Sequence, residues 1–199
     1  MGTAGALTVG AQDILDFWFG PPGSAEHGSA RDVWFRKDPA FDALIAERFG
    51  DRVEQALAGG LREWETDAGP ALARILLLDQ FTRNIFRGTA RAFAGDALAL
   101  PAARRMVATG QDMALAPLAR SFVYLPFEHA EDLATQDEAV VLFERLAAAS
   151  PECRDMAQYT HRHRAIIARF GRFPHRNAIL GRPSTDEELA FLELPGSGF

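Results

Sequence analysis

The sequence predicts an all-α protein, and three observations point to that fold class. Apolar residues recur at intervals of three and four along nearly the whole chain, which is the period of an amphipathic helix. No stretch has the sustained apolar–polar alternation that is typical of a half-buried strand. Glycine and proline fall between the periodic segments, where they end one helix and precede the next. The 199 residues, of which 48% are hydrophobic and 24% charged, suit a single domain over residues 1–199.

The first part of the chain contains signals for both ends of a helix. A helix over residues 12–19 ends at a Gly-Pro-Pro sequence, and residues 20–31 are expected to form a loop. Asp38 is a suitable N-cap for a helix that begins at Pro39, because a first helical residue does not need the N–H that proline lacks. Residues 1–10 are expected to be flexible.

Prolines mark the helices in the middle of the chain. Pro70 begins a helix that continues to Phe81 and is apolar on nearly all sides, which predicts a place in the centre of the core. Pro101 is expected to kink the next helix. Pro117 begins a further helix that Pro126 is expected to interrupt.

Two spacings in the last part predict capping boxes, in which a hydroxyl and a carboxylate satisfy the first backbone N–H groups of a helix. They are Thr135 with Glu138 and Thr185 with Glu188. A long helix is expected between them, over residues 151–170. In total the sequence predicts eight or nine helices.

The formal net charge of -6 argues against general binding to nucleic acids or anionic membranes, which attract positively charged proteins. Residues 156–182 are an exception, because they contain six arginines and no acidic residue. This stretch carries +6 and the remainder of the chain -12. A local site for an anion is therefore compatible with the overall charge.

The single cysteine, Cys153, cannot form an intrachain disulfide or a cysteine-based metal cluster. The N-terminal segment lacks the basic start and apolar centre of a signal peptide, and no apolar run is long enough to span a membrane. We therefore expect a cytoplasmic protein without a nucleic-acid or membrane partner, a cofactor or a bound metal. The sequence leaves the oligomeric state open.

The DQFTRN motif places charged side chains on an apolar helix face. Asp79 shares that face with Leu72 and Ile75, and Arg83 follows one turn later. One interpretation is a buried ion pair that fixes the packing of the helix. The other is that Asp79, Arg83 and Asn84 line a polar pocket and contact a ligand.

The YLPFEHAE motif places acid and base side chains at an expected helix break. His129 lies between Glu128 and Glu131, directly after Pro126. The spacing matches no established metal-binding pattern. His129 therefore either binds a ligand or forms a structural hydrogen bond at the helix junction.

The third motif, FGRFPHRN, follows a helix on which His163 faces the core and His161 faces water. Its polar side chains lie on an irregular loop, a common position for binding residues, and arginine suits carboxylate or phosphate groups. The alternative is that the loop only satisfies helix ends. The polar residues of the loop are Arg172, His175, Arg176 and Asn177.

The motifs together resemble the bacterial family catalogued as domain of unknown function 924. The resemblance rests on ILDFWFG (14–20), LLLDQFTRNIFRGTARAF (76–93), YLPFEHAEDLATQ (124–136) and HRAIIARFGRFPHRNAILGR (163–182) with the following STDEE. It implies an all-helical fold similar to tetratricopeptide-like arrays of helix pairs, although the standard repeat consensus is absent. The family brings no activity with it. Thr82 and Ala130 depart from its pattern, which has proline and serine there, and Pro101 interrupts a helix that the family has uninterrupted.

Three hypotheses about function follow. In the first, the helical scaffold binds a small anionic ligand or a peptide in a polar pocket that the three motifs form, with the arginines as anion contacts. In the second, the protein is an enzyme in which Asp79 or Glu131 works with His129, His163 or His175 as an acid–base pair or metal site. In the third, the motifs are one buried polar network that fixes the helices. The first is favoured because helical arrays usually bind other molecules, which is an analogy of fold.

Overall fold

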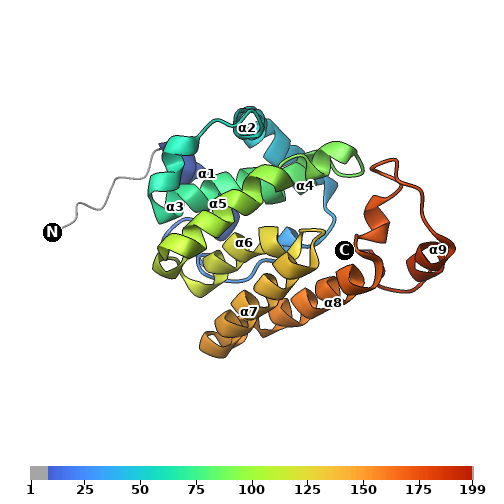
Figure 1. Ribbon diagram of the computed structural model, residues 1–199. Coiled ribbons are helices and arrows are strands. Elements are labelled where there is room, and N and C mark those ends of the chain that lie inside the picture. The colour runs from blue at the N-terminus through green and yellow to red at the C-terminus, as the bar shows by residue number, and fades with distance from the viewer. Residues whose placement is uncertain (1–8, 199) are drawn as a thin grey trace. The chain divides into compact units, whose positions relative to one another are not determined.

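A computed structural model describes residues 9–198 of the chain and is drawn in Figure 1. The described residues form helices and contain no strand, so the predicted all-α fold class is confirmed. The α-helices are α1 (Val9–Phe19), α2 (Pro39–Leu57), α3 (Ala68–Leu76), α4 (Thr82–Ile85), α5 (Asp96–Thr109), α6 (Pro117–Glu128), α7 (Leu133–Ala149), α8 (Arg154–Phe170) and α9 (Asp186–Leu192). Short 3-10 helices lie between them: η1 (Asp32–Trp34), η2 (Arg62–Thr66), η4 (Ala90–Phe93), η5 (Gln111–Ala114), η6 (Pro151–Cys153) and η7 (Pro174–Arg176). None of these helices has the length and apolar character needed to cross a membrane.

The described chain packs as two compact units. Unit 1 comprises residues 9–87 and 91–126, and unit 2 comprises residues 88–90 and 127–198. The expected flexible segment 1–10 lies mostly outside the described residues, but Val9 and Gly10 already belong to α1. Residues 20–31 contain turns and bends without a helix.

Unit 1 has an aromatic core. The rings of Trp18, Phe81 and Phe122 pack together, with centroid distances from Trp18 of 5.3 Å to Phe81 and 5.7 Å to Phe122. All three side chains are fully or almost fully buried. Helix α3 packs against both α1 and α5 in this unit, which gives the expected apolar helix its central place.

Unit 2 is built on the helix pair α7 and α8, which lie side by side in Figure 1. The connection between them is only Ser150 and η6, so the two helices run antiparallel. Helix α8 ends at Gly171, whose φ of +69° is the left-handed conformation that favours glycine at a helix end. The loop that follows leads through η7 to α9.

Several predicted helix ends are confirmed and others are wrong. The Asp38 carboxylate accepts hydrogen bonds from the N–H groups of Ala40 and Phe41, and Thr185 with Glu188 forms the predicted capping box. The predicted cap at Thr135 is wrong. Asp132 caps α7 instead, because its carboxylate accepts bonds from both the N–H, at 2.8 Å, and the hydroxyl, at 2.7 Å, of Thr135.

Two of the proline predictions also need correction. Pro126 does not interrupt α6, which continues to Glu128. The helix expected from Pro70 begins two residues earlier, at Ala68, and changes at Leu77 to a π-helical turn, η3 (Leu77–Phe81), before α4.

Candidate functional site

The first motif lies in unit 1, in and after the π-helical turn η3. Such turns contain one extra residue per turn and frequently occur at functional sites. Asp79 lies within the turn, with only 1% of its surface exposed. The Thr82 hydroxyl donates to the carbonyl of Leu78 at 2.8 Å and approaches that of Asp79 at 3.2 Å. The Thr82 side chain therefore satisfies backbone oxygens of the turn.

Arg83 lies between two carboxylates of unit 1. Its Nη1 atom is 3.1 Å from Asp79 Oδ1 and 2.9 Å from Asp96 Oδ1, and its Nη2 atom is 3.1 Å from Asp96 Oδ2. Burial alone would lower the pKa of Arg83, but the charges of Asp79 and Asp96 outweigh it and raise the pKa. The guanidinium is thus held by acidic groups of the same unit.

Asn84, the remaining polar residue of the first motif, is also engaged within unit 1. Its amide donates to Asp42 Oδ1 at 2.7 Å, and Arg87 forms a two-point pair with the same carboxylate at 2.8 and 2.9 Å. Asp42 lies in the first turn of α2, so these bonds fix α4 against α2.

Helix α8 places His163 in the interior of unit 2, as the helical wheel predicts, with 6% of the residue exposed. His161 points outward and pairs with exposed Glu144. The His163 Nδ1 atom is 2.9 Å from the Tyr159 carbonyl, which can only accept, so the ring carries its proton on Nδ1 and its lone pair on Nε2. Burial lowers the pKa of His163 to about 3, although the Tyr159 bond acts in the opposite direction.

The carboxylate of Glu128 lies beside His163. Its Oε1 atom is 3.4 Å from His163 Nδ1, and its Oε2 atom accepts a short hydrogen bond from the Thr160 hydroxyl. Gln136 donates to the backbone carbonyls of Glu128 and, at 2.8 Å, of Ala130, which satisfies the end of α6. The helix junction is therefore a closed hydrogen-bonded unit around a neutral imidazole.

The remaining histidine and arginine side chains of the second and third motifs lie around Phe173 and His163. Its buried ring packs 5.5 Å from the His163 ring and 5.7 Å from the His175 ring, and the Arg176 guanidinium lies 4.5 Å above it. The His129 ring is 6.4 Å from that of His163. His129 and His175 are partly exposed, whereas Arg176 is buried. The charges of His129, Arg176 and His175 also act to lower the pKa of His163.

Glu131 joins the second motif to the third. It accepts a hydrogen bond from the N–H of Phe173 at 2.8 Å and forms a two-point ion pair with Arg182. Burial would raise the pKa of Glu131, but the Arg182 and Phe173 hydrogen bonds outweigh it and lower the pKa. The carboxylate is therefore charged and anchors the loop.

The comparisons with known proteins agree on one assignment. A family model described as bacterial protein of unknown function, DUF924, matches residues 14–196. The chain belongs to the DUF924 family. It is similar to a protein of unknown function, ATU0120 from Agrobacterium tumefaciens, whose solved structure has 43% sequence identity, a TM-score of 0.81 and coverage of 92% of this chain and 96% of that one. The chain matches no curated protein.

Two of the predicted binding residues of this DUF924 chain have structural partners within unit 2. Arg172 forms a two-point pair with Glu188 at 2.6 and 2.8 Å, and these bonds lower the pKa of Glu188 to about 2. Asn177 is fully buried, donates to Ser184 at 3.0 Å and accepts from Arg182 at 3.0 Å. Both side chains hold the loop between η7 and α9.

The structure thus brings Glu128, His129 and Glu131 of the second motif together with the third motif of this DUF924 chain within unit 2. The first motif lies in unit 1, and its participation in one pocket with the others stays a prediction. Sequence analysis missed Thr160 and Phe173, which organise the histidine cluster. The spacing could have identified Thr160, because it lies three positions before His163 and residues at that spacing share one face of a helix.

No three His, Cys, Asp or Glu side chains among residues 9–198 come together as the ligands of a metal ion would. What the cluster offers is a neutral buried imidazole, two partly exposed imidazoles and a buried guanidinium.

Proposed function

We propose that the DUF924 chain binds a small anionic ligand at the histidine cluster of unit 2, defined as His129, His163, His175 and Arg176. One observation carries the proposal: the imidazoles of His163 and His175 and the guanidinium of Arg176 surround the ring of Phe173, and the His129 ring lies 6.4 Å from that of His163. The partly exposed His129 and His175 give the ligand an approach from solvent.

The electrostatics of the cluster support an anion. Besides burial, which is the largest cause, the charges of His129, Arg176 and His175 lower the pKa of His163, so these three groups contribute positive potential at its ring, opposite in sign to that of the Glu128 carboxylate 3.4 Å away. An anion at that place would be attracted, and the planar donors of Arg176 suit carboxylate or phosphate oxygens.

The fold supports a binding role by analogy only. All-helical arrays similar to tetratricopeptide repeats usually present surfaces to other molecules, and the family resemblance suggests such an arrangement for this chain.

An acid–base enzyme is the second candidate, favoured by the 3.4 Å contact between Glu128 and His163. A general base works best with a pKa near the operating pH, and the pKa of His163 at about 3 makes its imidazole a weak base. Glu131, which the enzyme hypothesis names together with Asp79, is paired with Arg182. These two facts favour binding over proton transfer.

The test is a titration of the protein with inorganic phosphate at pH 7, followed by NMR of the histidine side-chain nitrogens. We expect the signals of His129, His163 and His175 to shift together and to saturate. His161 and His27 are internal controls, because His161 points away from the cluster and His27 belongs to unit 1.

The matched variants are His129→Ala and His175→Ala, with His161→Ala as the control on α8. Lost phosphate response with normal melting temperature would support ligand binding. A large fall in melting temperature for both cluster variants, with the phosphate response absent from the parent protein, would support the purely structural hypothesis and contradict the proposal.

A further inference from the structure

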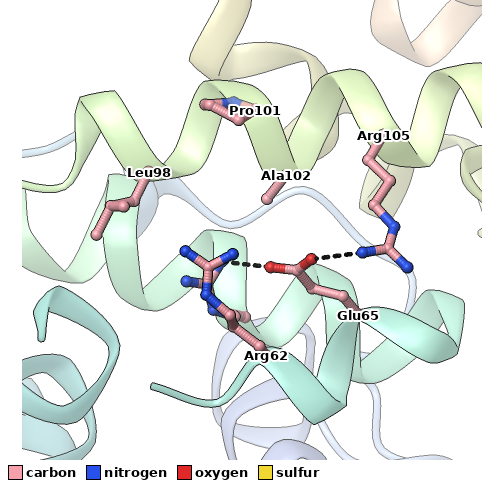
Figure 2. A pocket seen from close by; sticks show the side chains of 7 residues that line it. Arg62, Glu65, Leu98, Pro101, Ala102 and Arg105 are labelled. Carbon is pink, nitrogen blue, oxygen red and sulfur yellow. Dashed lines mark hydrogen bonds and ion pairs between the residues drawn. The ribbon is translucent and has the colours of Figure 1, made fainter. Parts of the chain in front are cut away.

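A second charged site lies in unit 1, in a cavity of about 270 Å³ that the sequence motifs do not include. Figure 2 shows Glu65 of η2 between arginine side chains, with Leu98 and Pro101 of α5 on the opposite wall. The arginines are Arg62, from η2, Arg74, from α3, and Arg105, from α5. The cavity is therefore lined by charged groups from three elements and by an apolar wall from α5.

Arginine outnumbers carboxylate in this cavity. Glu65 is buried, and it accepts from Arg74 Nη1 at 2.9 Å through one oxygen and from Arg105 Nη1 at 3.0 Å through the other. Three guanidinium groups and one carboxylate leave the lining with a charge of +2. Glu63 also acts on the charge of Arg74 but does not line the cavity.

Arg74 is the residue that makes this excess unusual, since it is only 1% exposed. Its Nε atom donates to the Gly60 carbonyl at 3.0 Å, which fixes the plane of the guanidinium. Burial and the nearby charge of Arg62 lower the pKa of Arg74, and Glu65 only partly opposes them. A buried cation is normally matched by opposite charge, so a further anion in the cavity would stabilise this arrangement.

The exposed arginines of the cavity are not needed to neutralise Glu65. Arg74 alone supplies one positive charge to that carboxylate, yet Arg105 pairs with it as well and Arg62 adds a third guanidinium. Arg105 and Arg62 are exposed and reach the lining from different elements. With these two arginines beside the Glu65–Arg74 ion pair, the lining of the cavity is positively charged.

We propose that this arginine pocket, defined as Arg62, Glu65, Arg74 and Arg105, binds a phosphate monoester. A doubly charged anion matches the +2 lining, and donors from three elements suit the three terminal oxygens of a tetrahedral phosphate better than the two of a planar carboxylate. Leu98 and Pro101 offer an apolar surface to the ester group. The volume lies near the lower end of ligand pockets, which limits the ligand to metabolite size.

The experiment is calorimetric titration of the full chain at low salt with methyl phosphate, inorganic phosphate and succinate, the last as a dicarboxylate of equal charge. We expect methyl phosphate to bind, with an affinity that falls as sodium chloride is added. Arg62→Ala and Arg105→Ala should each weaken it about tenfold, the usual size of one lost charge-assisted hydrogen bond. Arg104→Ala is the matched control, because Arg104 is the exposed neighbour of Arg105 on α5 and does not line the cavity.

The outcomes separate this proposal from the histidine cluster. If the arginine variants lose calorimetric binding while the phosphate shifts of His129, His163 and His175 persist, the pocket is an independent site. Equal affinity in the double variant Arg62→Ala/Arg105→Ala, or an equal loss in Arg104→Ala, would overturn the proposal. Binding of succinate without methyl phosphate would overturn the ligand class.

Discussion

Unit 1 contains two clusters of arginine and carboxylate side chains that are built in opposite proportions. In one, Arg83 lies between Asp79 and Asp96. In the arginine pocket, Glu65 lies between Arg74 and Arg105. In the first cluster two carboxylates contact one guanidinium, whereas in the second three guanidinium groups and one carboxylate line a cavity.

The difference shows how the same kinds of residue serve two purposes. Arg83 donates to the Asp96 carboxylate and, at 2.8 Å, to the carbonyl of Asp79, so its hydrogen bonds join η3 to the start of α5. In the arginine pocket, the single carboxylate holds two guanidinium groups in position, and their remaining N–H groups are available to a ligand. The proportion of acidic to basic side chains therefore distinguishes a cluster that only holds elements together, here called a clasp, from a candidate binding site.

The histidine cluster of unit 2 accommodates a buried ionisable side chain in a third way. His163 is almost as buried as Arg74, but burial lowers its pKa to about 3, so its imidazole is neutral at pH 7 although the Glu128 carboxylate lies 3.4 Å from Nδ1. A buried group can thus be paired, left in excess or neutralised, and each case makes a different prediction about stability.

The largest effect is expected for Arg83→Leu. The change removes the Arg83 guanidinium from the buried Asp79 carboxylate, which should lower the free energy of unfolding by about 3 to 5 kcal/mol. Urea denaturation would measure it. Arg91→Ala is the control, because its pair with Glu54 is exposed and should be worth less than about 1 kcal/mol. Equal losses in the two variants would show that Arg83 is not a clasp.

A smaller loss is expected for Glu65→Gln, which removes the carboxylate between Arg74 and Arg105. The buried Arg74 loses its charged partner, which should cost about 2 to 3 kcal/mol. Phosphate should restore part of this stability, because an anion that binds only the folded state stabilises it by mass action. The melting temperature with and without phosphate checks both statements. Arg83→Leu is the contrast, since phosphate should raise its melting temperature no more than that of the parent.

The neutral His163 predicts a dependence of stability on pH. Its pKa is 6.5 in an unfolded chain and about 3 in the folded protein, so the unfolded state binds an extra proton between these values. Stability should therefore be complete above about pH 6.5 and fall as the pH drops towards 3, by up to about 1.4 kcal/mol per pH unit. His163→Asn, which retains a donor for the Tyr159 carbonyl, should flatten this part of the profile. An unchanged slope in the variant would mean that another group causes the loss.

Sequence analysis found the features that depend on neighbouring residues. Proline after Asp38, and glutamate three residues after Thr185, identify helix starts because capping needs only a few consecutive residues. Helical spacing likewise places His163 inside and His161 outside. At α7, however, both Asp132 and Thr135 are suitable caps, and only the geometry of the junction selects Asp132.

The features that sequence analysis missed depend on residues that are far apart in the chain. Glu65 and Arg105 are separated by 40 positions, and no local pattern connects them. The pair of Glu131 with Arg182 spans 51 positions and has the same character. Ion pairs of this kind follow from the packing of helices, which a single sequence does not determine.

The smallest expected effect on stability belongs to Arg105→Ala, and it sharpens the comparison between the two clusters. The Arg105 side chain is 57% exposed, and Arg74 still neutralises Glu65 after the change, so unfolding should become easier by less than about 1 kcal/mol. The same variant is expected to weaken methyl phosphate binding about tenfold. Parallel urea denaturation and calorimetry would measure the two effects on one protein sample. A residue of a binding site should contribute to anion affinity but little to folding stability. A stability loss comparable to that of Arg83→Leu would instead show that Arg105 holds the fold together. The proportion of acidic to basic residues would then fail to distinguish the two clusters.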